Sequence, residues 1–141
     1  MRDIQKRPFY GVIKEFKHWV VLFRDKQVTI GSVIIMSKQL DKESLGGVSV
    51  EAWSEFGRVC MFVETTIKDA FGANKFNYLA LMMYDPEVHF HVVPRYSEPV
   101  QFMGKDFVDP DWPDATKRVA MDLGDDVLRA IKEKLLLAAG N

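Results

Sequence analysis

The sequence has one cysteine, Cys60, among 141 residues. A single cysteine excludes an internal disulfide, and in a helical apolar pattern such a thiol is typically a buried side chain rather than a reactive one. The chain also lacks a run of about 20 apolar residues, the length that a membrane-spanning helix needs. It begins with the charged Met1-Arg2-Asp3 rather than a secretory leader. Together these absences predict a cytoplasmic protein without a membrane partner.

An excess of charge of either sign is absent as well. The 19 Lys and Arg residues balance the 20 Asp and Glu residues, and the net charge is −1. No basic field therefore favours binding to a nucleic acid polymer. The chain has no repeats or low-complexity linkers, and its 48% hydrophobic and 28% charged content is ordinary for a globular protein. This length and composition predict one domain over residues 1–141.

The apolar pattern predicts an α+β fold. Strands rich in β-branched and aromatic residues are expected at 9–16, 19–23, 31–36 and 76–84, and at the histidine-containing stretch up to Pro94. A long helix is expected between an N-cap at Ser49 and a C-cap at Gly72. Asp85-Pro86 predicts a tight turn, residues 96–114 an ordered loop, and residues 114–139 a last helix with Gly124 in its middle. Hairpins rather than βαβ units favour an antiparallel sheet.

The stretch Glu87-Val88-His89-Phe90-His91-Val92-Val93-Pro94-Arg95 holds two of the three histidines. Side chains alternate between the faces of a strand, so His89 and His91 are expected on one face, together with Glu87. The apolar residues between them are expected to face the core. This row of ionisable groups is the best candidate for a functional site in the sequence.

Three interpretations of the row remain open from the residues alone. A neutral imidazole can attack phosphorus and form a covalent intermediate that water later hydrolyses. Alternatively, Glu87, His89 and His91 offer three ligands suited to zinc or iron. The histidines could also be structural and simply form hydrogen bonds with their neighbours.

The run from His89 to Arg95 resembles the signature of the histidine triad (HIT) superfamily, in which histidines alternate with apolar residues before Pro-Arg. The two predicted strands around Gly31 and the long helix also follow that family's order, so the resemblance covers about residues 10–95. It implies a HIT-like antiparallel sheet of about five strands with a long helix packed on it and a C-terminal helix. It also implies a homodimer.

The resemblance further implies hydrolysis or transfer at the α-phosphate of a nucleotide, without a metal or other cofactor. His89 matches the nucleophile of the family, and His91 the histidine that contacts the phosphate. Dinucleoside polyphosphates and nucleoside phosphoramidates are the implied substrate classes. A non-catalytic nucleotide-binding protein of the same fold and a Glu-His-His metalloprotein are the alternatives.

Three features depart from the family pattern. Glu87 stands where the first histidine of the triad belongs, and its carboxylate can accept a hydrogen bond from an imidazole. The short Tyr84-Asp85-Pro86 turn replaces a glycine-rich phosphate loop. Arg24 lies near the position of a nucleotide-contacting asparagine. Together with Asn77 and Arg95, Arg24 is predicted to bind the nucleotide.

Overall fold

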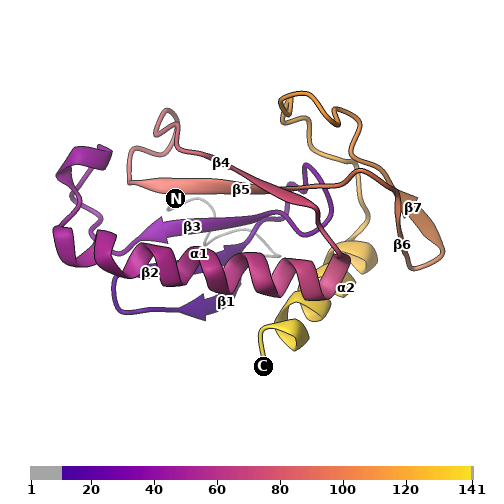
Figure 1. Ribbon diagram of the computed structural model, residues 1–141, viewed down its shortest axis with the longest axis horizontal. Helices are drawn as coiled ribbons and strands as arrows, with labels where there is room; N and C mark the ends of the chain where they lie inside the picture. The colour runs from indigo at the N-terminus through magenta and orange to yellow at the C-terminus, as the bar shows by residue number, and fades with distance from the viewer. Residues whose placement is uncertain (1–10, 141) are drawn as a thin grey trace.

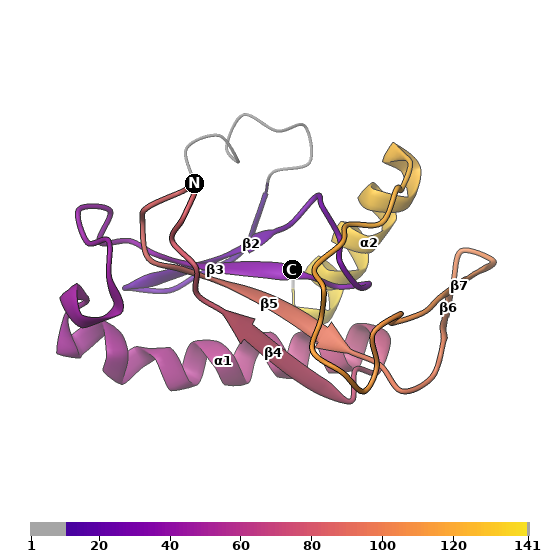
Figure 2. The same cartoon turned by 90° about the horizontal axis from the view of Figure 1, so that it is seen from above.

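The computed structural model describes residues 11–140. The start of the first predicted strand and the charged N-terminus lie outside the described residues. An antiparallel sheet of five strands carries a long helix along one face (Figure 1, Figure 2). The strands are β1 (Val12–Glu15), β2 (Trp19–Phe23), β3 (Val33–Ser37), β4 (Lys75–Leu79) and β5 (His89–Arg95), in the order β1-β2-β3-β5-β4. The predicted α+β class and sheet are confirmed.

The long helix, α1 (Val50–Phe71), has both predicted caps. The Ser49 hydroxyl accepts a hydrogen bond from the amide of Ala52 at 3.2 Å, which satisfies one free donor of the first turn. Gly72 has φ 75°, a left-handed conformation that glycine adopts without steric cost, and its amide donates to the Lys68 carbonyl at 2.8 Å. A second helix, α2 (Asp125–Ala138), packs beside α1, and its Ile131 and Leu135 are buried in the same core cluster. No helix in the described range is long and apolar enough to cross a membrane.

The alternation of side chains along the strands separates two faces of the sheet. On the α1 side, Phe90 of β5 packs with Phe56 of α1, their ring centroids 4.8 Å apart. His89 and His91 therefore face away from α1, where they are paired in register with Met36 and Ile34 of β3. The predicted separation of the histidines from the core-facing residues of this strand is confirmed.

The predicted antiparallel pairing of β4 with β5 is confirmed, but the length of β4 and the tight turn between the two strands are corrected. β4 ends at Leu79, and residues 80–88 form a loop instead of continuing the strand into a tight turn. Met82 has φ 47°, which interrupts the extended backbone, and Pro86 has no amide hydrogen for a ladder. The loop matters for function because it leads directly into the histidines.

Two further corrections concern the C-terminal third. The predicted loop at 96–114 contains a hairpin of β6 (Val100–Phe102) and β7 (Lys105–Phe107). The last helix starts at Asp125 rather than at residue 114, and Gly124 is its N-cap rather than its middle. Residues 108–124, called the C-terminal arm below, form neither helix nor strand. The arm bonds to the body of the fold instead, for example from the Met121 amide to the Gln27 carbonyl at 2.7 Å.

Candidate functional site

His89 is the first residue of β5, and it is buried with 4% of its surface exposed. Its Nδ1 lies 2.6 Å from the backbone carbonyl oxygen of Glu87. A carbonyl only accepts hydrogen bonds, so Nδ1 carries the hydrogen and donates it. In the neutral imidazole the lone pair is then on Nε2. This is the tautomer that an attacking Nε2 requires.

His91 lies beside His89 on the same face, with the ring centroids 5.0 Å apart and the rings at 80° to each other. A guanidinium Nη1 of Arg24, which follows β2, contacts Nδ1 of His91. Arginine can only donate, so Nδ1 of His91 accepts and the imidazole hydrogen is on Nε2. The two histidines thus have opposite tautomers: His89 offers a lone pair at Nε2, and His91 offers an N–H donor there.

The surroundings of His91 keep it neutral. Burial, followed by the charges of Arg24, His89 and Arg118, lowers the pKa of His91 to about 3, against a smaller opposing effect of Asp85. At neutral pH the imidazole is therefore a hydrogen-bond donor and not an acid.

Gln27 fixes the turn that carries Arg24, a role that a polar residue in a loop does not reveal in the sequence. Its side chain is fully buried, and its Nε2 donates to the carbonyls of Arg24 at 2.5 Å and Ser32 at 2.8 Å. Its Oε1 accepts from the Gly31 amide at 2.7 Å. Arg24 also donates from Nε to the Lys26 carbonyl at 2.8 Å. Hydrogen bonds within the loop after β2 therefore position the Arg24 guanidinium beside His91.

Glu87 lies just before β5, so the prediction that it shares the strand with the histidines is wrong. Glu87 is not in the strand because residues 80–88 form a loop and the pairing of β5 with β3 starts only at His89. The side chain of Glu87 is buried, with 5% of the residue exposed. Its backbone carbonyl, rather than its carboxylate, sets the tautomer of His89. Its predicted catalytic role stays a prediction.

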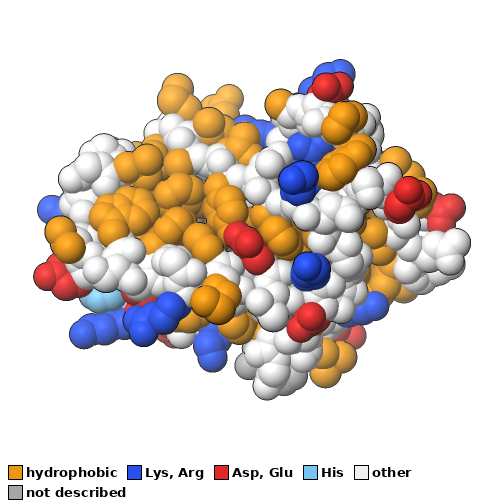
Figure 3. Space-filling model, viewed as in Figure 1, with side chains coloured by type: hydrophobic (Ala, Val, Ile, Leu, Met, Phe, Trp, Pro, Cys, Tyr) orange, Lys and Arg blue, Asp and Glu red, His pale blue; other side chains and the backbone are white. Residues whose placement is uncertain are grey.

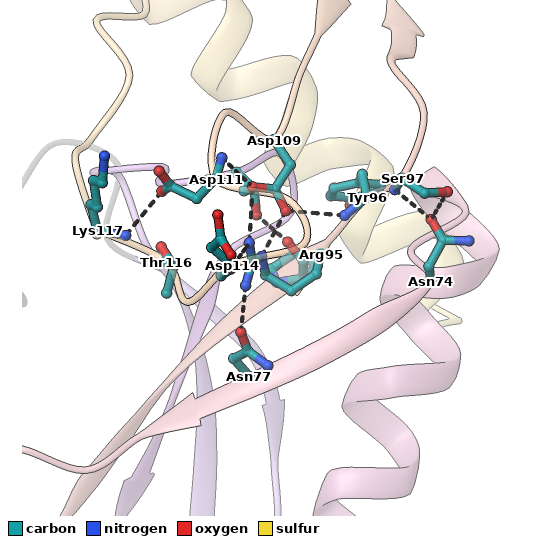
Figure 4. A network of polar contacts seen from close by, with 12 residues as sticks. Asn74, Asn77, Arg95, Tyr96, Ser97, Asp109, Asp111, Asp114, Thr116 and Lys117 are labelled. Carbon is teal, nitrogen blue, oxygen red and sulfur yellow. Dashed lines mark hydrogen bonds and ion pairs between the residues drawn. The ribbon is translucent and has the colours of Figure 1, made fainter.

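Arg95 and Asn77 form part of a polar network at the far end of β5 (Figure 4). The Arg95 guanidinium donates from Nε to Asp109 at 2.6 Å, from Nη1 to Asn77 at 2.7 Å and from Nη2 to the Asp114 carbonyl at 2.8 Å. The network joins the sheet to the C-terminal arm. It accounts for the burial of Arg95, while the predicted contact of both residues with a nucleotide stays a prediction.

The arm brings Arg118 to the histidines, a residue that sequence reasoning missed. Its charge lies close enough to contribute to the low pKa of His91. The backbone there is bent, with φ 59° at Arg118, and is held on either side by bonds from the amides of Lys117 to Asp111 at 2.9 Å and Met121 to Gln27 at 2.7 Å. Nothing in the sequence around Arg118 distinguishes it from an ordinary surface arginine, so its position near His91 could not be predicted.

A cleft of about 760 Å³ lies between β4 and the arm. Asn77 and Leu79 line it on the sheet side, and Trp112 and Thr116 on the arm side. Leu79 is paired with His91 across β4 and β5, so the cleft begins one strand away from the histidines. A volume in this range suits a small-molecule ligand.

The donor atoms do not form a metal site. Within residues 11–140, no three His, Cys, Asp or Glu side chains come together in a group that could hold a metal ion. Arg24 also donates to Nδ1 of His91, so Nε2 of that ring carries the hydrogen and neither ring nitrogen has a free lone pair for a metal ion. The geometry therefore gives the Glu-His-His metal interpretation no support.

No family model matches the sequence, and no curated protein does. The fold, in contrast, is similar to those of solved histidine triad proteins. One from Marinobacter aquaeolei has a TM-score of 0.74 at 18% identity, covering 99% of this chain and 94% of its own. One from Sinorhizobium meliloti has a TM-score of 0.73 at 16% identity, with 97% and 93% covered. A hypothetical histidine triad nucleotide-binding protein from Sulfolobus tokodaii has a TM-score of 0.69 at 16% identity, with 94% and 85% covered.

These superpositions cover nearly the whole chain, and each is to a histidine triad protein. The chain therefore has the histidine triad fold.

Proposed function

We propose that this protein is a hydrolase or nucleotidyl transferase that acts at the α-phosphate of a nucleotide derivative through a nucleotidyl-His89 intermediate. The hydrogen bond from Nδ1 of His89 to the Glu87 carbonyl supports this most, because it leaves the Nε2 lone pair for attack. The fold likeness supports a nucleotide as the ligand. One of the similar structures is named as a nucleotide-binding protein.

The proposed reaction has two steps. In the first, Nε2 of His89 attacks the α-phosphorus, a P–N bond forms, and the bond to the leaving group breaks. The Glu87 carbonyl stabilises the positive charge that develops on the ring, since it accepts the Nδ1 hydrogen. In the second, water attacks the same phosphorus and releases a proton to solvent, while the P–N bond breaks and its electron pair returns to Nε2. A second nucleophile in place of water gives transfer instead of hydrolysis.

The positive charges around the histidines suit an anionic substrate. Arg24 contacts His91, and Arg118 acts on it from the arm. These two guanidinium groups offset the buried carboxylate of Glu87 and stand in for the missing glycine-rich phosphate loop. Dinucleoside polyphosphates and nucleoside phosphoramidates are the substrate classes to test. The cleft beside Leu79 has room for the nucleoside of such a substrate.

A non-catalytic nucleotide-binding protein is the second candidate. The observation in its favour is the buried Glu87, whose negative charge next to His89 opposes the approach of a phosphate. Binding of a nucleotide without turnover would identify this class.

The proposal includes a homodimer of this single domain. The outer edge of β4 has no strand partner among the described residues, and an unpaired edge can join a second sheet. Hydrophobic side chains also gather over α1 and the loop at 80–88 (Figure 3). Met61 is 66% exposed there and Met83 is 80% exposed. Light scattering should give twice the chain mass of 16.2 kDa.

A trapping experiment tests the reaction. The protein is mixed with a dinucleoside polyphosphate, quenched without acid and examined by intact-protein and peptide mass spectrometry. One nucleotidyl group on the peptide of His89 is expected, and none in His89→Gly. His18→Gln is the matched control, because it removes a histidine outside the site and should keep the label. A label that persists in a folded His89→Gly variant, or turnover without any label, would overturn the proposal.

A further inference from the structure

His91 cannot give a proton to a leaving group while Arg24 contacts it. Arginine stays protonated in proteins, so the hydrogen bond between them is always donated by Arg24 to Nδ1 of His91. A second proton on His91 would have to go to that same nitrogen. The contact therefore excludes the imidazolium, and loss of the remaining Nε2 proton would leave an imidazolate, which is far too basic to form here.

Most of the groups around His91 lower its pKa as well. Arg24 approaches from the loop after β2, His89 from the same strand and Arg118 from the C-terminal arm; Asp85, from the loop before β5, opposes them. Burial, Arg24, His89 and Arg118 together outweigh the Asp85 carboxylate, so the net effect is a lower pKa of His91. His91 thus offers a hydrogen bond at Nε2 but no transferable proton.

The consequence for the reaction depends on the leaving group. When the P–O bond of a phosphoanhydride breaks, the electron pair goes to a phosphate oxygen, which is stable as an anion and needs no proton. An alcohol or amine leaving group of high pKa departs only if it is protonated as the bond breaks, and a positioned acid accelerates that by typically about 10²–10⁴-fold. This site lacks such an acid among the residues that face His91.

Building on the proposed function, we propose that Arg24 makes this site selective for substrates whose leaving group departs as a stable anion, such as the phosphate chain of a nucleoside polyphosphate. Arg24 acts as a positioning residue: it holds His91 in the form that donates a hydrogen bond to the phosphate oxygens. Arg118 is the second cation: its backbone amide donates to the Thr116 hydroxyl at 3.0 Å, while its guanidinium forms no hydrogen bond or ion pair with another residue of the described range. Its charge is available to the anionic leaving chain.

A leaving-group series tests this. The probes are aryl esters of adenosine 5′-phosphate whose phenols differ in pKa, with adenosine 5′-phosphoramidate as an amine case. For the wild type at pH 5.5, kcat/KM should fall steeply as the phenol pKa rises. In Arg24→Gln the guanidinium no longer blocks Nδ1 of His91, so the contact no longer excludes a second proton there. The ratio of kcat/KM between the best and the worst leaving group should then shrink at least about tenfold, since a general acid assists.

Lys26→Gln is the matched control, because Lys26 is an exposed cation of the same loop and gives only its backbone carbonyl to Arg24. This variant should keep the wild-type ratio, and a loss of stability alone would change kcat without changing the ratio. A wild-type rate independent of the phenol pKa, or an equal ratio in Arg24→Gln and Lys26→Gln, would overturn the inference and leave the proposed function intact. No turnover and no labelled His89 with any ester would overturn the proposed function, and this inference with it.

Discussion

The buried ion pair between Arg95 and Asp109 should contribute strongly to stability. The two side chains are 5% and 1% exposed, and Nε lies 2.6 Å from Oδ2. Asp109→Asn leaves the guanidinium buried without its counter-charge, which in proteins costs about 3–5 kcal/mol of unfolding free energy. With a urea dependence of about 2 kcal/mol per molar, the unfolding midpoint should fall by about 2 M.

An exposed pair of the same chemistry provides the control. Arg129 and Asp126 of α2 lie 3.5 Å apart with 59% and 92% of their side chains exposed. Solvent screens such a pair, so Asp126→Asn should cost less than about 1 kcal/mol. Urea unfolding followed by circular dichroism measures both variants under the same conditions. A cost below about 1 kcal/mol for Asp109→Asn, or one equal to that of Asp126→Asn, would refute the reasoning.

The pH dependence of the same variant follows from the pKa of Asp109. Burial alone would raise it, but hydrogen bonds from Arg95 and from the amides of Tyr96 and Asp111 lower it below the ordinary value of 3.8. The folded state thus binds its proton more weakly than the unfolded chain, so the carboxylate stabilises the fold above about pH 4 and this contribution is lost as the pH falls through the folded pKa. The difference between wild type and Asp109→Asn should therefore be full at pH 7 and smaller near pH 3.

Three further predictions concern the histidine site. His89→Gly should lower kcat for a dinucleoside polyphosphate by several orders of magnitude while circular dichroism shows a retained fold; near-wild-type turnover would exclude His89 as nucleophile. Glu87→His should keep the tautomer of His89, which depends on a backbone carbonyl, and should raise hydrolysis by removing a negative charge near the phosphate; if Glu87→His and Glu87→Gln both abolish turnover, the carboxylate has a role in the reaction. NMR titration should show His91 neutral down to about pH 3, and stability should decline between pH 6.5 and 3 as the unfolded chain takes up the proton; titration of His91 near pH 6.5 would contradict its assigned surroundings.

Much of the fold could be predicted because local signals agreed with the final packing. The Ser49 and Gly72 caps and the apolar stripe between them define α1, and the alternation along β5 separates His89 and His91 from the core. These features depend on short-range chemistry, which a sequence displays directly.

The errors arose where long-range contacts decide the conformation. The C-terminal arm carries apolar residues at helical spacing, but its hydrogen bonds go to distant residues such as Gln27 and Arg95 instead of along a helix. The same contacts bring Arg118 to His91, which lies 27 positions earlier in the chain. The contact of Arg24 with His91 joins two elements far apart in sequence in the same way. Only Arg24 could be suggested beforehand, through the family resemblance.

The construction of the C-terminal arm also has a consequence for local unfolding. No helix or strand lies between β7 and α2, so the part of the arm after Asp114 can detach when a few hydrogen bonds break, while the Arg95–Asp109 ion pair stays in place. Such sub-global openings need less free energy than complete unfolding. The amides of Lys117 and Met121 donate to Asp111 and Gln27, and their hydrogen exchange would report the opening directly. Arg118 lies between these two amides, so a folded molecule whose arm is open lacks the Arg118 charge at the site. A bound polyphosphate should therefore slow hydrogen exchange at these two amides at a lower concentration than it slows exchange in the sheet.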